Sequence, residues 1–307
     1  MLCHVSHPKS TLCARRLTFT DDSIAVFSLQ SASLTSCQPL SGQRDRPLLK
    51  MSKPKPPGFR KLSCSECRNG KSLGFEFSMA FQPIINTETG QVYAYEALAR
   101  GPEGQGAGWV FQHVNAENLY RFDQTCRVKA IGLAAELSLP GYLSINFMPN
   151  AVYRPELCIR TTLEAAERFG FPLERIMFEF TENEKIQSIE HITGIIEYYQ
   201  KTGFITAIDD FGAGFSGLNL LADLQTDVIK IDMYLIRNID SDRARQAIVR
   251  SIVHCCQELS IQVIAEGVET EAEWLCLRQL GITLYQGYLF AVPAFETIPA
   301  IHIPSGG

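Results

Sequence analysis

Residues 227–269 read DVIKIDMYLIRNIDSDRARQAIVRSIVHCCQELSIQVIAEGVE. Two short apolar runs, DVIKID and QVIAEGVE, flank a stretch over 240–260 that has the length and the amphipathic pattern of a helix. A strand, a helix and a strand in that order indicate two parallel strands joined by a helical crossover. The same unit recurs along the chain from residue 76, which predicts a parallel sheet covered by helices.

The other apolar runs extend this rhythm in both directions. They are FEFSMAFQPII, VYAYEALAR, YLSINFM, RIMFEFTE, FITAIDD and LYQGYLF, and further helix-like segments lie at 155–169, 184–202 and 270–280. Roughly eight strands over about 230 residues predict a closed α/β fold, a TIM-like (β/α)8 barrel. An open doubly wound sheet is the alternative. Only NTETGQ separates the first two runs, which is a hairpin connection, so we expect one antiparallel strand near the start of the barrel.

Composition excludes several classes of protein. The 307 residues carry a formal charge of -5, and 46% of them are hydrophobic, as in an ordinary globular protein. No run of 18 apolar residues occurs, so we expect no membrane span. The negative charge argues against a nucleic-acid polymer as partner but leaves a small nucleotide open.

The first 72 residues differ from the rest of the chain. Residues 1–61 hold ten Lys or Arg against three Asp or Glu, and the remainder holds 18 basic and 30 acidic residues. We expect a basic, disordered segment over 1–72, with Met51 as an alternative start, and a folded domain over 73–304. Ten irregularly spaced cysteines favour a reducing compartment, and hence the cytoplasm. Cys64 and Cys67 form one CxxC pair, which alone is a weak signal for zinc or redox chemistry.

Polar residues stand where the predicted strands end. Glu96 closes the second strand, Asn146 the third, Glu179 with Glu182 the fourth, Asp209 and Asp210 the fifth, Lys230 and Asp232 the sixth, and Glu266 the seventh, while Gln286 precedes the last. In a β/α barrel these strand ends ring one mouth, where active sites form. Any one carboxylate there could simply cap the following helix or form one half of a structural ion pair. Five or more of them beside one lysine and one arginine cannot all ionise without divalent cations.

The donor types indicate which cations. Carboxylate oxygens with one Asn carbonyl suit Mg²⁺ or Mn²⁺, whereas zinc prefers Cys and His. Asp209 can bridge two such metals while Asp210 binds the second, which makes two adjacent negative charges tolerable. A pair of divalent metals about 3.5–4 Å apart hydrolyses phosphoesters.

Seven motifs carry a family resemblance. EALAR, NF with PN, FEFTE, DDFGAGFSGL, IKID, AEGVE and QGYLF resemble, in order and spacing, the EAL family of bacterial cyclic di-GMP phosphodiesterases, over residues 76 to about 295. The surrounding stretches MAFQPI, SINFMPNAVY and AIDDFGAGFSGLNLLA look most like EAL domains fused to flavin light sensors, and the segment before residue 73 is too short for a usual sensory domain.

The resemblance implies a role for each matching position. Glu96, Asn146, Glu179 and Asp209 would bind the first metal, and Asp209, Asp210 and Glu266 the second. Glu266 would lie near the attacking water, which Lys230 would orient with help from Asp232. Gln82 and Arg100 would hold the substrate phosphates, and Gln286 the water or ligand network. Glu182 would anchor the DFGAGFSGL loop, which couples metal binding to a dimer interface. Ala213, Phe215 and Gly217 replace the commoner Thr, Tyr and Ser of that loop, which puts regulation in doubt more than chemistry.

The sequence therefore predicts a cytoplasmic phosphodiesterase that opens cyclic di-GMP to the linear dinucleotide pGpG. It would use two Mg²⁺ or Mn²⁺ per active site, be inhibited by Ca²⁺, and form a homodimer open to a regulatory protein. One alternative is a catalytically silent EAL module that binds the nucleotide or a protein partner. Another is an unrelated metal-dependent barrel enzyme of the enolase type, which is less supported because Lys230 is the one lysine expected at the mouth and Arg100 is present.

Overall fold

The computed structural model of the chain describes residues 73–152, 154–181, 188–214 and 217–305. The basic segment predicted over 1–72, with Met51 and the CxxC pair, lies outside these residues.

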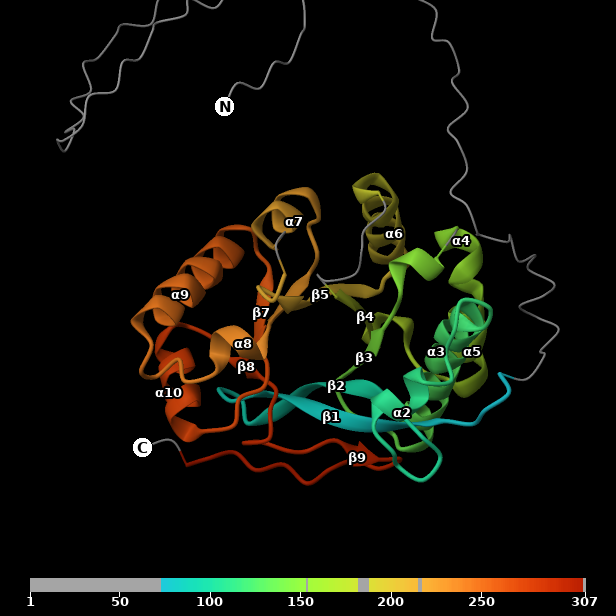
Figure 1. Cartoon of the computed structure of the whole chain (residues 1–307), viewed down its shortest axis with the longest axis horizontal. Coiled ribbons are helices and arrows are strands. Elements are labelled where there is room, and N and C mark those ends of the chain that lie inside the picture. Colours follow the sequence, from blue (N-terminus) through green and yellow to red (C-terminus); the bar gives the residue numbers. More distant parts are fainter. Residues whose placement is uncertain (1–72, 153, 182–187, 215–216, 306–307) are drawn as a thin grey trace, which may run out of the picture. The chain divides into compact units, whose positions relative to one another are not determined.

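Eight strands close into a barrel (Figure 1). They are β1 (Ser78–Asn86), β2 (Gln91–Arg100), β3 (Tyr142–Asn146), β4 (Ile176–Thr181), β5 (Ile205–Phe211), β6 (Val228–Ile231), β7 (Gln262–Ala265) and β8 (Leu284–Tyr285). Strands β2 to β8 pair in parallel, and β1 closes the ring because it pairs with both β2 and β8. Both of these pairings are antiparallel, so the predicted barrel with one antiparallel strand is confirmed and the open sheet is wrong. A short further strand that was not predicted, β9 (Ala294–Phe295), pairs with β1.

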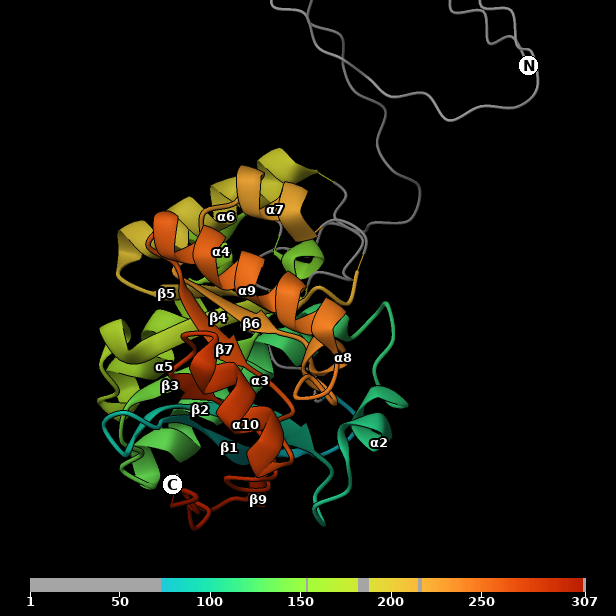
Figure 2. The same cartoon turned by 90° about the vertical axis from the view of Figure 1, so that its left-hand side faces the viewer.

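Helices surround the strands on the outside (Figures 1 and 2). They are α2 (Ala107–Phe111), α3 (Leu119–Glu136), α4 (Pro155–Cys158), α5 (Arg160–Phe169), α6 (Ile189–Thr202), α7 (Gly217–Asp223), α8 (Met233–Ile236), α9 (Arg243–Glu258) and α10 (Glu271–Gln279), with 3-10 turns at Pro149–Ala151 and Leu173–Arg175. The helix predicted over 240–260 begins three residues later than expected. Asp242 ends the preceding turn and accepts hydrogen bonds from the backbone N–H groups of Ala244 and Arg245, so it is the N-cap of α9.

Two separate sets of apolar side chains hold the barrel together. The larger set fills the space between the strands and the helices. The smaller set is an apolar layer inside the barrel, formed by Ile84, Ala94, Met177, Ala207, Val228, Ile264 and Leu284. These residues are at most 4% exposed. Since side chains alternate between the two faces of a strand, the residue two positions away on each strand faces the interior as well. The next layer of interior side chains on these strands therefore packs directly on the apolar layer.

Among the helices that the structure describes, none has the length and hydrophobicity needed to cross a membrane. The cytoplasmic location inferred from the cysteines stays a prediction.

Candidate active site

A polar layer lies directly above the apolar layer, toward the ends of the parallel strands. Each barrel strand, or the residue that follows it, contributes one side chain: Gln82, Glu96, Asn146, Glu179, Asp209, Lys230, Glu266 and Gln286. Six of these residues stand two positions after a member of the apolar layer, and Gln82 stands two before one because β1 runs the other way. The alternation of the strands thus brings residues that are far apart in sequence to one level of the barrel.

Two positions on the strands differ from the expectation. Glu96 lies in the middle of β2, four residues before its end, because β2 pairs with β1 along its whole length up to Arg100. Gln286 follows the last barrel strand, whereas we expected it to precede that strand. The strand β8 is only two residues long, and Gln286 comes directly after it. Both corrections leave the two side chains in the polar layer.

The carboxylates of this layer fall into two groups that share one residue. Glu96, Glu179 and Asp209 form the first carboxylate group, with one oxygen from each lying within 4.8 Å of the others. Asp209, Asp210 and Glu266 form the second carboxylate group by the same measure. Two such triads around a common Asp209 give two adjoining sets of oxygen donors.

The ammonium of Lys230 lies among these carboxylates and is fully buried. Its Nζ is 2.6 Å from Glu266 Oε1, 2.9 Å from Asp209 Oδ1 and 3.0 Å from Glu179 Oε2. The nearest oxygen of Glu96 is 3.4 Å away. One ammonium group thus faces four carboxyl groups, so acidic groups outnumber basic ones in the polar layer.

Side-chain amides complete the polar layer. Asn146 Nδ2 donates to Glu96 at 2.9 Å and to Glu179 at 3.3 Å. Gln286 Nε2 donates to Glu96 at 2.8 Å and to Gln82 at 3.2 Å. The amide of Gln82 in turn donates to the carbonyl oxygen of Ala291. These bonds fix the direction of the Glu96 carboxylate.

Burial shifts the proton equilibria of the carboxylates. It raises the pKa of Glu179 and of Glu266 well above the ordinary value, and Asp209 raises that of Glu266 further. Burial and the neighbouring Asp209 raise the pKa of Asp210 to about 6. Burial also acts to raise the pKa of Glu96, but Lys230 and the hydrogen bonds from Gln286 and Asn146 bring it below the ordinary value. Without further positive charge, several of these groups therefore tend to hold protons.

The remaining predicted site residues lie around this layer. Arg100 stands on the same face of β2 as Glu96, about 13 Å further along the strand. Its guanidinium donates to the carbonyl oxygen of Ala99. Asp232 accepts a hydrogen bond from the N–H of Tyr234 and is the N-cap of α8. Glu182 lies outside the described residues, as does Phe215.

The donor set fits a hard divalent cation. Gln286 Oε1 is buried and has no hydrogen-bond partner among the described residues, and the carboxylates of Glu96, Glu179, Asp209 and Glu266 share the single ammonium of Lys230. Buried oxygens in that condition are costly unless a cation or water binds them. Carboxylates and amides are the donors that Mg²⁺, Mn²⁺ and Ca²⁺ select. The two carboxylate groups could therefore each hold one such ion.

One supporting residue was missed from the sequence. Asp123 is buried on α3, where it forms an ion pair with Arg127 and accepts a hydrogen bond from the backbone N–H of Met148. Met148 lies two residues after Asn146, so this contact holds the turn that carries Asn146. The signal was an Asp and an Arg four residues apart, a spacing that places both on one helix face.

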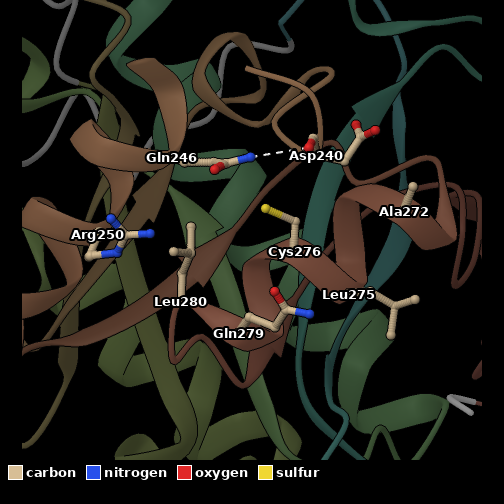
Figure 3. A pocket seen from close by; sticks show the side chains of 8 residues that line it. All are labelled: Asp240, Gln246, Arg250, Ala272, Leu275, Cys276, Gln279 and Leu280. Carbon is tan, nitrogen blue, oxygen red and sulfur yellow. Dashed lines mark hydrogen bonds between the residues drawn. The ribbon is translucent and has the colours of Figure 1, made fainter. Parts of the chain in front are cut away.

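A pocket on the outside of the barrel is separate from this layer. It lies between α9 and α10, has a volume of about 450 Å³, and is lined by residues that include Asp240, Arg250 and Cys276 (Figure 3). The amide of Gln246 donates to the backbone carbonyl of Asp240 at its rim. None of the predicted site residues lines this pocket.

Comparison with known proteins defines the family of the chain. The model of the EAL domain matches residues 68–293, so the chain belongs to the EAL domain family. It is 34% identical over 226 residues to the blue light- and temperature-regulated antirepressor BluF of Escherichia coli, covering 73% of this chain and 56% of BluF. The probable cyclic di-GMP phosphodiesterase PdeG of the same organism is 28% identical over 234 residues, which are 73% of this chain and 45% of PdeG. The chain thus spans about half the length of these relatives.

Solved structures agree with this assignment. A standalone versatile EAL protein from Vibrio cholerae, in its c-di-GMP-bound form, is 56% identical with a TM-score of 0.73, covering 75% of this chain and 98% of that one. BlrP1 of Klebsiella pneumoniae, in a complex with manganese and cyclic di-GMP, is 37% identical with a TM-score of 0.69, covering 74% of this chain and 59% of BlrP1. A calcium complex of BlrP1 is similar to the same degree.

Proposed function

We propose that this chain hydrolyses cyclic di-GMP to linear pGpG with the help of divalent cations bound in the polar layer. The observation that carries the proposal is the pair of carboxylate groups that share Asp209 inside the barrel. Membership of the EAL family and the c-di-GMP-bound form of the Vibrio protein support the choice of substrate. The manganese and calcium complexes of BlrP1 support the choice of a hard cation.

Each carboxylate group would hold one cation. The first cation would take Glu96, Glu179 and Asp209, and Asn146 would join them through its amide oxygen. Since Nδ2 of Asn146 now faces Glu96 and Glu179, its amide would have to turn over to present that oxygen. The second cation would take Asp209, Asp210 and Glu266. Bound divalent cations would supply charge neutralisation for the phosphodiester and lower the pKa of a water near it.

The chain's own groups would position the reactants. The Lys230 ammonium would hold the attacking water, since it already lies within 3.0 Å of three carboxylates that border the two groups. Glu266 would lie near the attacking water, since its Oε1 is 2.6 Å from the Lys230 ammonium that would hold that water. Gln82, Gln286 and Arg100 would bind the phosphates and the water network. Asp232 would act through α8, whose first turn it caps.

A catalytically silent binding module is the second candidate, because BluF, a relative of this chain, is named an antirepressor. Turnover separates the two. Purified chain stripped with chelator and then given Mn²⁺ should convert cyclic di-GMP to pGpG, measured by chromatography, and Asp209→Asn should not. Nucleotide binding by the wild type without any product would refute hydrolysis and favour the silent module.

Inhibition by Ca²⁺, a homodimer and a regulatory protein partner stay predictions of the same proposal. Ca²⁺ takes more ligands at longer distances than Mg²⁺, so it should relax the arrangement that the carboxylate groups impose. Adding Ca²⁺ to the manganese-loaded protein in the turnover assay, and sedimentation of the purified chain, would test the first two.

A further inference from the structure

The short helix α8 contacts the backbone on both sides of the second carboxylate group. Gly267 follows Glu266 directly, has a φ of +62°, and a methyl group on it would stand 2.4 Å from the Cβ of Met233 on α8. Gly212 follows Asp210 by two residues, has a φ of +93°, and a methyl group on it would stand 2.5 Å from Leu235 Cδ1. Helix α8 is therefore packed against the turns that carry Asp210 and Glu266.

The two contacts differ in stiffness. Cδ1 of Leu235 is the end of a flexible side chain, which can rotate away. Cβ of Met233 is attached to the helix backbone, and its Cα lies 3.5 Å from the same point. A methyl group on Gly267 would therefore force either helix α8 or the backbone at Gly267 to move.

Hydrogen bonds make movement of the helix costly. The N–H of Asp232 donates to the carbonyl oxygen of Phe211 at the end of β5, at 3.1 Å. The N–H of Glu266 donates to the carbonyl oxygen of Ile231 at the end of β6, also at 3.1 Å. Asp232 in turn caps α8. The start of α8 is thus tied to both turns, and an added atom at position 267 would displace Glu266.

We infer that Gly267 and Met233 are a positioning pair for Glu266. The close packing of the glycine on Met233 sets how near the Glu266 carboxylate stands to Asp209 and Asp210. Met233 as a whole is 46% exposed, yet its Cβ lies against the turn after β7. The inference rests on the proposed function, because it assumes that the second carboxylate group binds a cation.

The test is a size exchange in the full chain, read as Mn²⁺ binding by calorimetry to chelator-stripped protein. Gly267→Ala adds the clashing methyl group, and Met233→Gly removes the atom against which the glycine packs. Each single variant should weaken binding at one of two sites by about 10-fold, as loss of a group that supports a metal ligand typically does. The double variant moves the Cβ from one residue to the other. Its Mn²⁺ affinities should lie within about threefold of the wild-type values, because the effects of substitutions at contacting residues are not additive.

Gly170→Ala is the matched control. Gly170 has a φ of +68°, close to that of Gly267, and no atom beyond its two chain neighbours lies within 4 Å of a methyl group placed on it. This variant should lower the melting temperature by the cost of a left-handed alanine and leave both Mn²⁺ affinities unchanged. It separates backbone strain from the contact with Met233.

Each outcome bears on one proposal. Wild-type affinities in Gly267→Ala, or a loss that Met233→Gly does not repair, would overturn the positioning pair and leave the proposed function standing. A wild type that binds no Mn²⁺ would overturn the proposed function itself. If Gly267→Ala does not fold, Met233→Gly alone decides, since unchanged affinity at both sites in that variant contradicts the inference.

Discussion

Replacing Lys230 by methionine removes the ammonium group that contacts four carboxylates inside the barrel. The pair with Glu179 is completely buried on both sides. Removing one partner of a buried ion pair leaves an uncompensated charge and costs about 3–5 kcal/mol. For a domain of this size, each kcal/mol lowers the melting temperature by about 2–4 °C, so the variant should melt roughly 6–20 °C below the wild type in the presence of chelator.

Two further results should accompany this loss. Mn²⁺ should stabilise Lys230→Met more than the wild type, because the cation replaces the missing positive charge. The deficit should shrink as the pH falls from 8 to 5. The raised pKa values of Glu179 and Glu266 mean that their charged forms are disfavoured in the folded state, and protonation at low pH relieves this.

Calorimetric melting of both proteins, with chelator and with Mn²⁺, measures these effects. Arg237→Met is the control, because Arg237 forms an ion pair with Glu269 at 2.7 Å on the surface. Such exposed pairs contribute about 0–1 kcal/mol, so that variant should lose little. A chelated Lys230→Met that melts together with the wild type at pH 8 would refute the view that this lysine balances the charge of the polar layer.

Three other expectations follow from the same structure. Met177→Ala opens a cavity in the apolar layer and should cost about 2–5 kcal/mol in denaturant unfolding, without changing the number of Mn²⁺ bound; an unchanged unfolding midpoint would contradict the packing. Because the pKa of Asp210 is about 6, Mn²⁺ affinity should fall between pH 7 and pH 5, and Asp210→Asn should flatten that slope in titrations. Glu179→Ala should abolish turnover, whereas Glu182→Ala should slow turnover by about 10–100-fold, with partial rescue at high Mn²⁺. Equal turnover of Glu182→Ala and the wild type would rule out a role for the Glu182 side chain.

The sequence predicted the barrel and the members of the polar layer for a simple geometric reason. Parallel strands end at one mouth of the barrel, and side chains alternate between the two faces of a strand. Polar residues that face the interior near the strand ends therefore meet at that mouth. Where strand length departed from the regular unit, the prediction failed. The long hairpin strand β2 placed Glu96 in its middle, and the two-residue β8 placed Gln286 after it.

Other features depend on contacts that no local pattern encodes. The supporting role of Asp123 was missed because its ion pair with Arg127 lies on the buried face of α3, where a charged pair interrupts the apolar stripe. Lys230 on β6 contacts four carboxylates because β2, β4, β5 and β7 bring them to the same level of the barrel. Gly267 packs on Met233 because the turn after β7 lies against α8. Such contacts join residues up to 134 positions apart and can be read only in three dimensions.

The proposed mechanism requires two divalent cations that share Asp209. Anomalous diffraction from crystals of the full chain grown with Mn²⁺ tests it most directly. We expect two manganese peaks in the polar layer, both bound by Asp209, one also by Glu96 and Glu179 and the other also by Asp210 and Glu266. A single peak, or two peaks of which one does not touch Asp209, would contradict it.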